Sequence, residues 1–93
     1  MYFQLTRRRC RKPVLFPNRI RLYRMEAGLS QRGLGKLVGH SRTLVSTWER
    51  GQCLPTAGNL FLLARALDTL SESLYYRLYV TAGRKVSRRR PKP

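Results

Sequence analysis

Glycine, proline and helix-capping residues divide the middle of this chain into short segments, and no internal repeat relates one segment to the next. Within these segments apolar residues recur at the spacing of an amphipathic helix, as Ile20, Tyr23 and Ala27 do. Strand signals are weak, since no Asn-Gly or Asp-Gly pair separates alternating runs. The sequence therefore predicts an all-α fold, a compact bundle of about five short helices.

Glycines and capping residues also set the expected helix boundaries. The first three helices are expected over residues 18–27, 30–37 and 41–49. Thr56 is expected to cap a fourth helix. Ser71 is expected to begin a fifth helix, which is followed by a basic tail from Gly83. The one strand candidate is a short pair of Leu78–Val80 with Val86.

The chain has 93 residues, with 20 Lys+Arg against 4 Asp+Glu, a formal net charge of +16 and a pI near 11.6. This length suits one small domain and leaves no room for the deep cleft of a large enzyme. Basic residues are concentrated at both ends, where no acidic residue occurs. We therefore expect a basic N-terminal arm over 1–16, a folded domain over 17–82 and a basic C-terminal tail over 83–93.

This excess of positive charge favours an anionic partner, and nucleic acid foremost. Solvated tails that only aid solubility share the composition. A membrane surface is disfavoured, because the basic residues flank the apolar helices instead of lining one of them. The apolar stretch Val14–Phe16 is too short for a signal-peptide core or a membrane span. The expected location is the cytoplasm, in association with the nucleoid.

Residues that hold metals or perform catalysis are sparse. Cys10, Cys53 and His40 lie far apart in sequence without a CxxC pair, so they predict no zinc site. A disulfide between the two cysteines stays open, although reduced thiols are expected in a cytoplasm. The single histidine has no nucleophile and acid patterned around it. The sequence thus predicts no enzyme, no cofactor and no small-molecule substrate.

The most informative segment runs from Leu29 to Gly51. It contains two short helical patterns joined by a turn at Gly39, where glycine supplies a positive φ without strain. Gly35 is the small residue that lets two such helices cross closely. The second helix of such a pair fits the major groove of double-stranded DNA.

The chain carries, in order, the motifs IRLYR, GLSQ, LGKLVG, SRTLVSTWERG and LLARAL. Together they resemble the lambda-repressor/Cro-like (XRE-type) helix-turn-helix family over about residues 19 to 75. The most specific matching positions are Ser30, Gln31, Gly39, Ser41, Arg42, Ser46 and Trp48–Gly51. Both tails lie outside the resemblance.

The resemblance implies a DNA-binding site around the second helix of the pair. Positions matching base contacts are Arg42, Thr43, Ser46 and Thr47. Positions matching phosphate contacts are Gln31, Ser41, Arg50 and Gln52, and Gln31 also matches a residue that braces the recognition helix. Arg42 is the leading specificity candidate, because a guanidinium can donate two parallel hydrogen bonds to guanine. For each base-contact candidate the alternative is a solvated surface residue.

The basic arms offer further contacts to DNA. The expected arm contacts are Arg7, Arg8, Arg9, Arg88, Arg89 and Arg90. Basic arms of helix-turn-helix proteins follow the DNA backbone or enter an adjacent minor groove.

One predicted constellation is structural. Arg24 follows Ile20 by four residues, so the helix period places it on the buried side, where an unpaired guanidinium is costly. The family resemblance pairs this position with that of Glu49. We therefore expect an Arg24–Glu49 ion pair between the first and third helices. Trp48 is expected in the core.

Three residues depart from the family pattern. Gly33 weakens the second helix by about 1 kcal/mol relative to alanine. His40 either covers the edge of the core with its ring or points toward a phosphate. Asp68 stands where the family often has a helix-ending glycine, so the start of the last helix is the least defined boundary.

The resemblance implies a sequence-specific transcriptional regulator with helix 41–49 in the major groove of double-stranded DNA. One recognition helix reads few base pairs, so a homodimer on a palindromic operator is expected. Apolar residues that either form the dimer interface or close the bundle are Leu70, Leu74, Tyr75, Tyr76, Leu78 and Tyr79. The alternatives are a DNA-binding antitoxin or subunit of a nucleoprotein complex, with a toxin or another subunit as protein partner, and a sequence-indifferent nucleic-acid binder.

Overall fold

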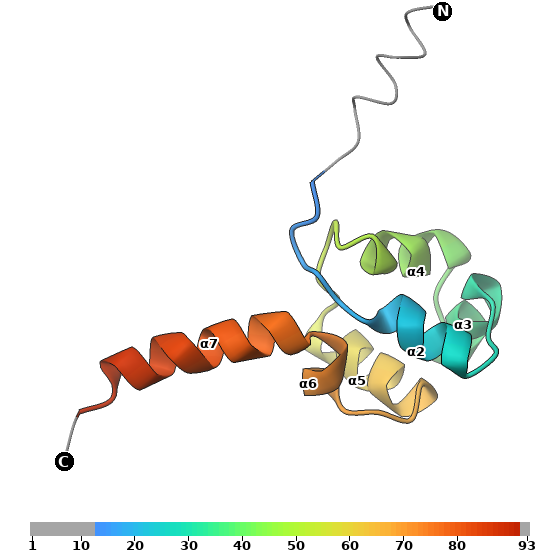
Figure 1. The fold of residues 1–93 in the computed structure, drawn as a ribbon. Helices are drawn as coiled ribbons and strands as arrows, with labels where there is room; N and C mark the ends of the chain where they lie inside the picture. The colour runs from blue at the N-terminus through green and yellow to red at the C-terminus, as the bar shows by residue number, and fades with distance from the viewer. Residues whose placement is uncertain (1–12, 92–93) are drawn as a thin grey trace, which may run out of the picture.

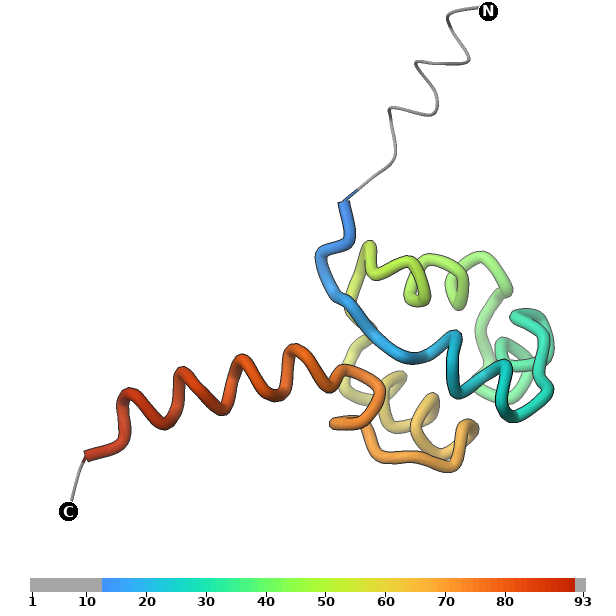
Figure 2. Tube along the Cα trace, viewed as in Figure 1, coloured from blue at the N-terminus to red at the C-terminus, as the bar shows by residue number. Residues whose placement is uncertain are grey.

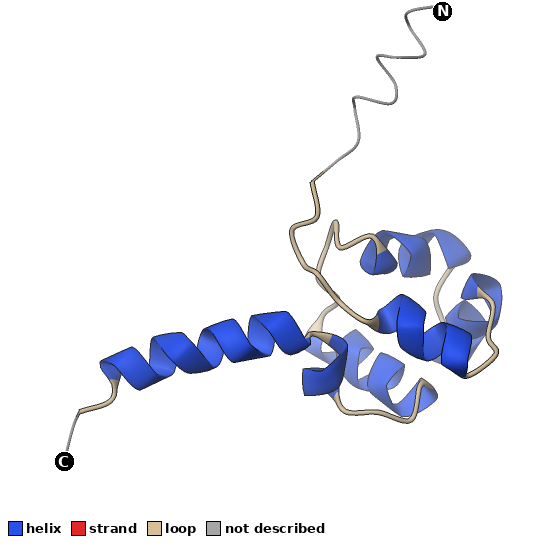
Figure 3. Ribbon diagram, viewed as in Figure 1, coloured by secondary structure: helices blue, strands red, loops and turns tan. Residues whose placement is uncertain are grey.

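In the computed structural model, which describes residues 13–91, every regular element is a helix and no strand is present (Figure 3). The helices are α2 (Ile20–Glu26), α3 (Gln31–Val38), α4 (Arg42–Glu49), α5 (Ala57–Ala66), α6 (Ser71–Leu74) and α7 (Tyr76–Arg89). Helices α2 to α6 gather into one body, and α7 projects away from it (Figure 1). The predicted all-α class is confirmed.

Capping side chains decide where three of the helices begin. Ser30, Ser41 and Thr56 are extended residues directly before α3, α4 and α5. The side-chain oxygen of each accepts a hydrogen bond from the amide three residues later. This bond satisfies one of the amides that the first helical turn leaves unpaired. The caps stand outside the helices, so α3 and α4 begin one residue later than expected.

The turn between α3 and α4 depends on two glycines. Gly39 ends α3 with a φ of +80°, the left-handed conformation that glycine adopts without strain. A Cβ atom on Gly35 would lie 2.5 Å from the carbonyl oxygen of His40. The close crossing of the two helices therefore excludes any side chain at Gly35, as the sequence predicts.

Side chains from α2 to α6, with Leu67 and Tyr75 that follow α5 and α6, fill one core. The buried apolar residues are Ile20, Leu34, Val38, Val45, Trp48, Leu63, Ala64, Leu67, Leu74 and Tyr75. Trp48 is 2% exposed, as predicted. Burying a large apolar side chain contributes about 1.5–3 kcal/mol. Leu74 and Tyr75, which were candidates for a dimer interface, close the bundle instead.

The connection from α5 to α7 contains two irregular residues. Asp68 has a φ of +54°, a conformation that aspartate tolerates better than most residues with a side chain. It therefore takes the turn for which the family often uses glycine. Tyr75, at φ −118° and ψ 47°, separates α6 from α7. The expected fifth helix is thus two helices.

Helix α7 corrects two expectations. Leu78–Val80 and Val86 lie in the same helix, so the expected strand pair is wrong. The helix also continues through Gly83 to Arg89. A glycine costs about 1 kcal/mol in a helix but does not end it, because the alanine and basic residues around it favour helix. The expected boundary between domain and tail at residue 83 falls inside this helix.

Residues 13–19 run beside the loop that follows α4 (Figure 2). The amides of Leu15 and Phe16 both donate to the carbonyl oxygen of Gly51 at 2.9 Å. A Cβ on Gly51 would lie 2.7 Å from the Val14 side chain, so glycine is needed there too. The segment is therefore fixed to the C-terminal end of α4. Arg7, Arg8, Arg9 and Cys10 lie outside the described residues.

Candidate nucleic-acid interface

The outer face of α4 carries the polar residues of the expected site. A helix turns 100° per residue, which places Arg42, Thr43, Ser46 and Thr47 on one side, away from the buried Val45 and Trp48. Arg42 and Thr43 are exposed, whereas Ser46 and Thr47 are half-buried. The fold therefore brings all four predicted base-contact residues together on one accessible surface.

Two hydrogen bonds organise this surface. Arg50 Nη1 donates to Ser46 Oγ at 2.9 Å, and Thr47 Oγ1 donates to the Thr43 carbonyl oxygen at 3.0 Å. The Arg42 guanidinium forms no hydrogen bond or ion pair with another described residue. Its full set of donors is therefore available at this surface.

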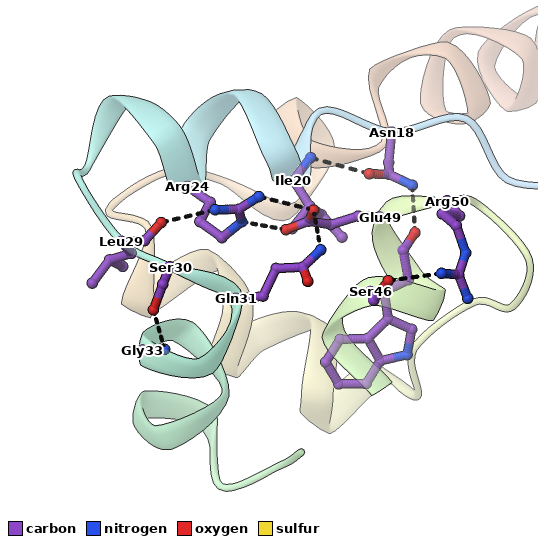
Figure 4. Close-up of polar contacts among 11 residues, drawn as sticks. Asn18, Ile20, Arg24, Leu29, Ser30, Gln31, Gly33, Ser46, Glu49 and Arg50 are labelled. Atoms are coloured by element: carbon purple, nitrogen blue, oxygen red, sulfur yellow. Dashed lines mark hydrogen bonds and ion pairs between the residues drawn. The ribbon is translucent and has the colours of Figure 1, made fainter. Parts of the chain in front are cut away.

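A buried cluster behind α4 holds the helix in place (Figure 4). Arg24 Nε lies 2.5 Å from Glu49 Oε2, and Arg24 Nη2 lies 3.2 Å from Glu49 Oε1. Gln31 Nε2 donates to Glu49 Oε1 at 3.1 Å. The side chains of Arg24 and Glu49 are 12% and 4% exposed. The predicted ion pair is present, and Gln31 braces it from α3.

This cluster also determines the charge of the interface. Glu49 is the one acidic residue of α4, and its carboxylate points inward to two donor side chains. The outer face of α4 therefore presents a guanidinium and hydroxyl groups without a competing carboxylate. Such a surface favours an anionic partner.

Asn18 is a positioning residue that the sequence analysis missed. Its side-chain nitrogen donates to the carbonyl oxygens of Phe16 at 2.9 Å and Trp48 at 2.8 Å, and its oxygen accepts from the Ile20 amide at 3.1 Å. It thus joins the start of α2 to the end of α4 (Figure 4). The available signal was an asparagine between Pro17 and the first helix, a typical capping position.

His40 packs against the core edge, the first of its two expected roles. Its ring meets Trp48 in an edge-to-face arrangement, with 5.6 Å between centroids and 78° between planes. Nε2 lies 2.8 Å from Asn59 Oδ1 on α5. The ring therefore ties the α3–α4 turn to the core.

A family profile described as helix-turn-helix matches residues 20–74. The chain belongs to the lambda-repressor/Cro-like (XRE-type) helix-turn-helix family. The matched span includes α2 to α6 with the α3–α4 pair at its centre. Helix α7 and residues 1–19 fall outside it.

Two curated members of the family are similar to this chain. The repressor protein C2 of Salmonella phage P22 is 42% identical over 54 residues, which are 58% of this chain and 25% of that protein. The HTH-type transcriptional regulator DicA of Escherichia coli (strain K12) is 41% identical over 57 residues, 61% of this chain and 42% of that protein. The chain thus spans less than half the length of either relative.

Solved structures of family members show the same fold. The P22 c2 repressor in complex with synthetic operator 9T is 39% identical, with a TM-score of 0.57 over 58% of this chain and 82% of that one. The restriction-modification controller protein C.AhdI from Aeromonas hydrophila is 40% identical, with a TM-score of 0.60 over 67% of this chain and 94% of that one.

Three of the residues that match the family's phosphate contacts flank α4 in the chain. Ser41 caps its start, while Arg50 and Gln52 follow its end. Arg88 and Arg89 are exposed on the last turn of α7, and Arg90 is exposed at its end. The residues expected as C-terminal arm contacts therefore lie on the last turn of α7 and directly after it, on a helix other than α4.

Other kinds of site find little support between residues 13 and 91. This part of the chain has no group of three or more His, Cys, Asp or Glu side chains that could hold a metal. None of its helices combines the length and apolar character that crossing a membrane takes.

Proposed function

We propose that the chain is a sequence-specific transcriptional regulator that binds double-stranded DNA with α4 in the major groove. The observation that carries this proposal is the outer face of α4, where a free guanidinium and three hydroxyl side chains are backed by a buried ion pair. A major groove about 12 Å wide admits such a helix. The P22 c2 repressor structure, a complex with an operator, supports the proposal by similarity.

Side chains on the outer face of α4 contact the bases. Arg42 donates two parallel hydrogen bonds to O6 and N7 of a guanine, a contact that discriminates by about 1–3 kcal/mol. Thr43, Ser46 and Thr47 offer hydroxyl groups to bases, and the two threonines also offer methyl groups to thymine. The bond from Arg50 to Ser46 orients the Ser46 hydroxyl before DNA arrives.

Phosphate contacts surround this readout surface. Gln31 uses one amide hydrogen on Glu49 and keeps the other for a phosphate oxygen. The remaining contacts to the backbone are Ser41, Arg50, Gln52, the arm residues Arg7, Arg8 and Arg9, and Arg88, Arg89 and Arg90. These contacts add affinity without base preference.

Regulation follows from occupying an operator, without catalysis or a cofactor. A homodimer places two copies of α4 on half-sites one DNA turn apart, about 34 Å. The domain that begins at residue 17 and contains α2 to α6 binds the operator, and the protein acts in the cytoplasm.

The test is to select bound sequences from a random pool of DNA duplexes with the full chain, with Arg42→Ala and with Arg65→Ala, an exposed arginine on α5, as control. We expect a palindromic motif for the full chain and for Arg65→Ala, and a weakened motif for Arg42→Ala. Absence of an enriched motif would contradict sequence-specific binding and favour a sequence-indifferent binder. Specific binding that required a second protein would favour a subunit of a larger complex.

A further inference from the structure

Helix α7 exposes an apolar stripe that no described residue buries. The stripe contains Tyr79, Ala82, Gly83 and Val86, whose i, i+3, i+4 and i+7 spacing places them on one side of the helix. Tyr79 is 59% exposed and Val86 is 52% exposed. In Figure 1 the helix leaves the body as a single extended rod.

The opposite side of α7 is basic, and repulsion between its like charges offsets part of the helix propensity of these residues. Arg77, Arg84, Lys85 and Arg88 lie there, and α7 has no acidic residue. Like charges four residues apart destabilise a helix, and so does a central glycine. An isolated helix of this length is only marginally stable in water. Covering the stripe would stabilise α7.

The stripe is complementary to itself. The midpoint between Ala82 and Gly83 is also the midpoint between Tyr79 and Val86 and the midpoint of α7. In an antiparallel pair centred there, Tyr79 faces Val86 of the second copy and Ala82 faces Gly83 of the second copy. The small residues then let the two backbones approach, and the larger ones fill the space on either side.

Gly83 is not needed by the fold of its own chain. A Cβ atom there would meet nothing within 4 Å, and the residue lies within a regular helix. A glycine that weakens α7 without a local reason fits a close approach by another helix.

An apolar groove continues the stripe toward the body. Leu54, Leu60, Tyr75, Leu78 and Tyr79 line it, with Ser71 and Glu72 also at its wall. The Tyr75 hydroxyl beside it is buried without a hydrogen-bond partner. Ser71 donates to Glu72 at 2.7 Å, and this bond lowers the pKa of the Glu72 carboxyl, which keeps it charged.

Charge selects the orientation of a paired helix. The C-terminal half of α7 holds Arg84, Lys85, Arg88 and Arg89. Its N-terminal end has fewer basic residues, Arg77 and the Arg19 guanidinium over the Tyr76 ring, with the acidic Glu72 nearby. An antiparallel partner brings its basic end toward Glu72, whereas a parallel partner sets the two basic ends side by side.

We propose that α7 pairs antiparallel with α7 of a second copy of this chain, through the stripe and the groove at its base. This pairing refines the homodimer of the proposed function and rests on that function for its use. The two bodies lie at opposite ends of the helix pair and are related by a two-fold axis, the symmetry that a palindromic operator requires.

Disulfide trapping of the full chain without DNA tests the pairing directly, with Cys10→Ser and Cys53→Ser as background. We expect Ala82→Cys to form a linked dimer under mild oxidation, because its two copies meet beside the axis. Thr81→Cys, at nearly the same height on the basic side, is the matched control and should remain monomeric. Equal linking of the two variants would overturn the proposal.

Mixed cysteine variants test the orientation. Tyr79→Cys mixed with Val86→Cys should give a linked heterodimer in preference to either linked homodimer. Preferred homodimers would mean a parallel pair and would overturn the antiparallel arrangement.

Sedimentation measures the strength of the pairing. Val86→Arg should raise the Kd of the dimer at least about tenfold, and Thr81→Arg, which adds the same charge on the basic side, should change it much less. An unchanged dimer in Val86→Arg, or a wild-type chain that stays monomeric, would overturn the proposal. An unchanged dimer with altered salt dependence of DNA binding would make α7 a DNA contact instead.

Binding to a duplex with one half-site separates this inference from the proposed function. Val86→Arg should keep the half-site affinity of the wild type. A chain that pairs through α7 but selects no DNA sequence would contradict the proposed function and leave the pairing intact.

Discussion

Glu49 links the stability of the domain to the position of its outer polar face. Both carboxylate oxygens accept hydrogen bonds, from Arg24 on α2 and Gln31 on α3. Arg24 also donates to the Leu29 carbonyl oxygen at 2.8 Å, so it holds the α2–α3 connection as well. A buried carboxylate with this set of donors orients α4 more narrowly than apolar packing alone.

Replacing Glu49 should therefore destabilise the fold. Glu49→Ala leaves the largely buried guanidinium of Arg24 without its carboxylate, and we predict a loss of about 3 kcal/mol in the free energy of unfolding. Glu26→Ala removes an exposed acid from α2 and should change it by less than about 0.5 kcal/mol. Urea unfolding of both variants measures the difference, and equal stabilities would contradict the role given to the pair.

We predict that the protein loses stability in alkaline solution because of Tyr75. Burial, with a smaller effect of Cys53, raises the pKa of the Tyr75 hydroxyl above its usual value of about 10. Above pH about 10 the folded state keeps the Tyr75 proton, whereas the unfolded state releases it. The free energy of unfolding is therefore unaffected by this group below pH about 10 and falls as the pH rises beyond it.

Thermal unfolding of the wild type and of Tyr75→Phe between neutral pH and the alkaline range tests whether stability falls as the pH rises. The wild type should lose stability more steeply above pH about 10. Tyr75→Phe should be no less stable at neutral pH, because the hydroxyl that it removes has no hydrogen-bond partner. Parallel pH profiles would show that Tyr75 does not titrate between the two states.

At the scale of the elements, what the sequence predicts correctly is local. Ser30, Ser41 and Gly39 act on atoms within a few residues, and helical periodicity alone places Trp48 in the core. Asn18 was missed because its acceptor, the carbonyl oxygen of Trp48, is 30 residues away. The end of α7 was misplaced because a glycine's cost of about 1 kcal/mol is small enough for its neighbours to offset.

The α3–α4 pair should tolerate no side chain at its crossing. We predict that Gly35→Ala lowers the free energy of unfolding by about 1–3 kcal/mol or more, since the added Cβ meets backbone that cannot move independently. Gly58→Ala in the first turn of α5 meets nothing within 4 Å and should be neutral or stabilising by up to about 1 kcal/mol. Chemical unfolding compares the two, and a stable Gly35→Ala would contradict the close crossing.

For the whole molecule, the net charge of +16 dominates association with any polyanion. The end of α7 is displaced from α4 (Figure 1), so we expect that any contact of its basic residues with DNA adds affinity without base preference. Counterion release makes their contribution visible in the salt dependence of binding.

Replacing Arg88, Arg89 and Arg90 together with alanine should weaken binding to all duplexes alike. The slope of log K against log salt should become shallower by about 0.9 for each phosphate contact that is lost. Titrations of one selected and one unrelated duplex at several salt concentrations measure this slope. An unchanged slope would show that these three arginines do not contact DNA phosphates.

The most direct test of α4 as the reading helix is competition binding of the selected duplex against all its single base-pair variants, with the wild type, Arg42→Ala and Gln52→Ala. We predict that Arg42→Ala loses about 1–3 kcal/mol of preference at one guanine in each half-site and keeps its other preferences. Gln52→Ala, which removes a proposed phosphate contact, should lower affinity more evenly across the variants. Base preferences that stay the same in Arg42→Ala would contradict recognition through the outer face of α4.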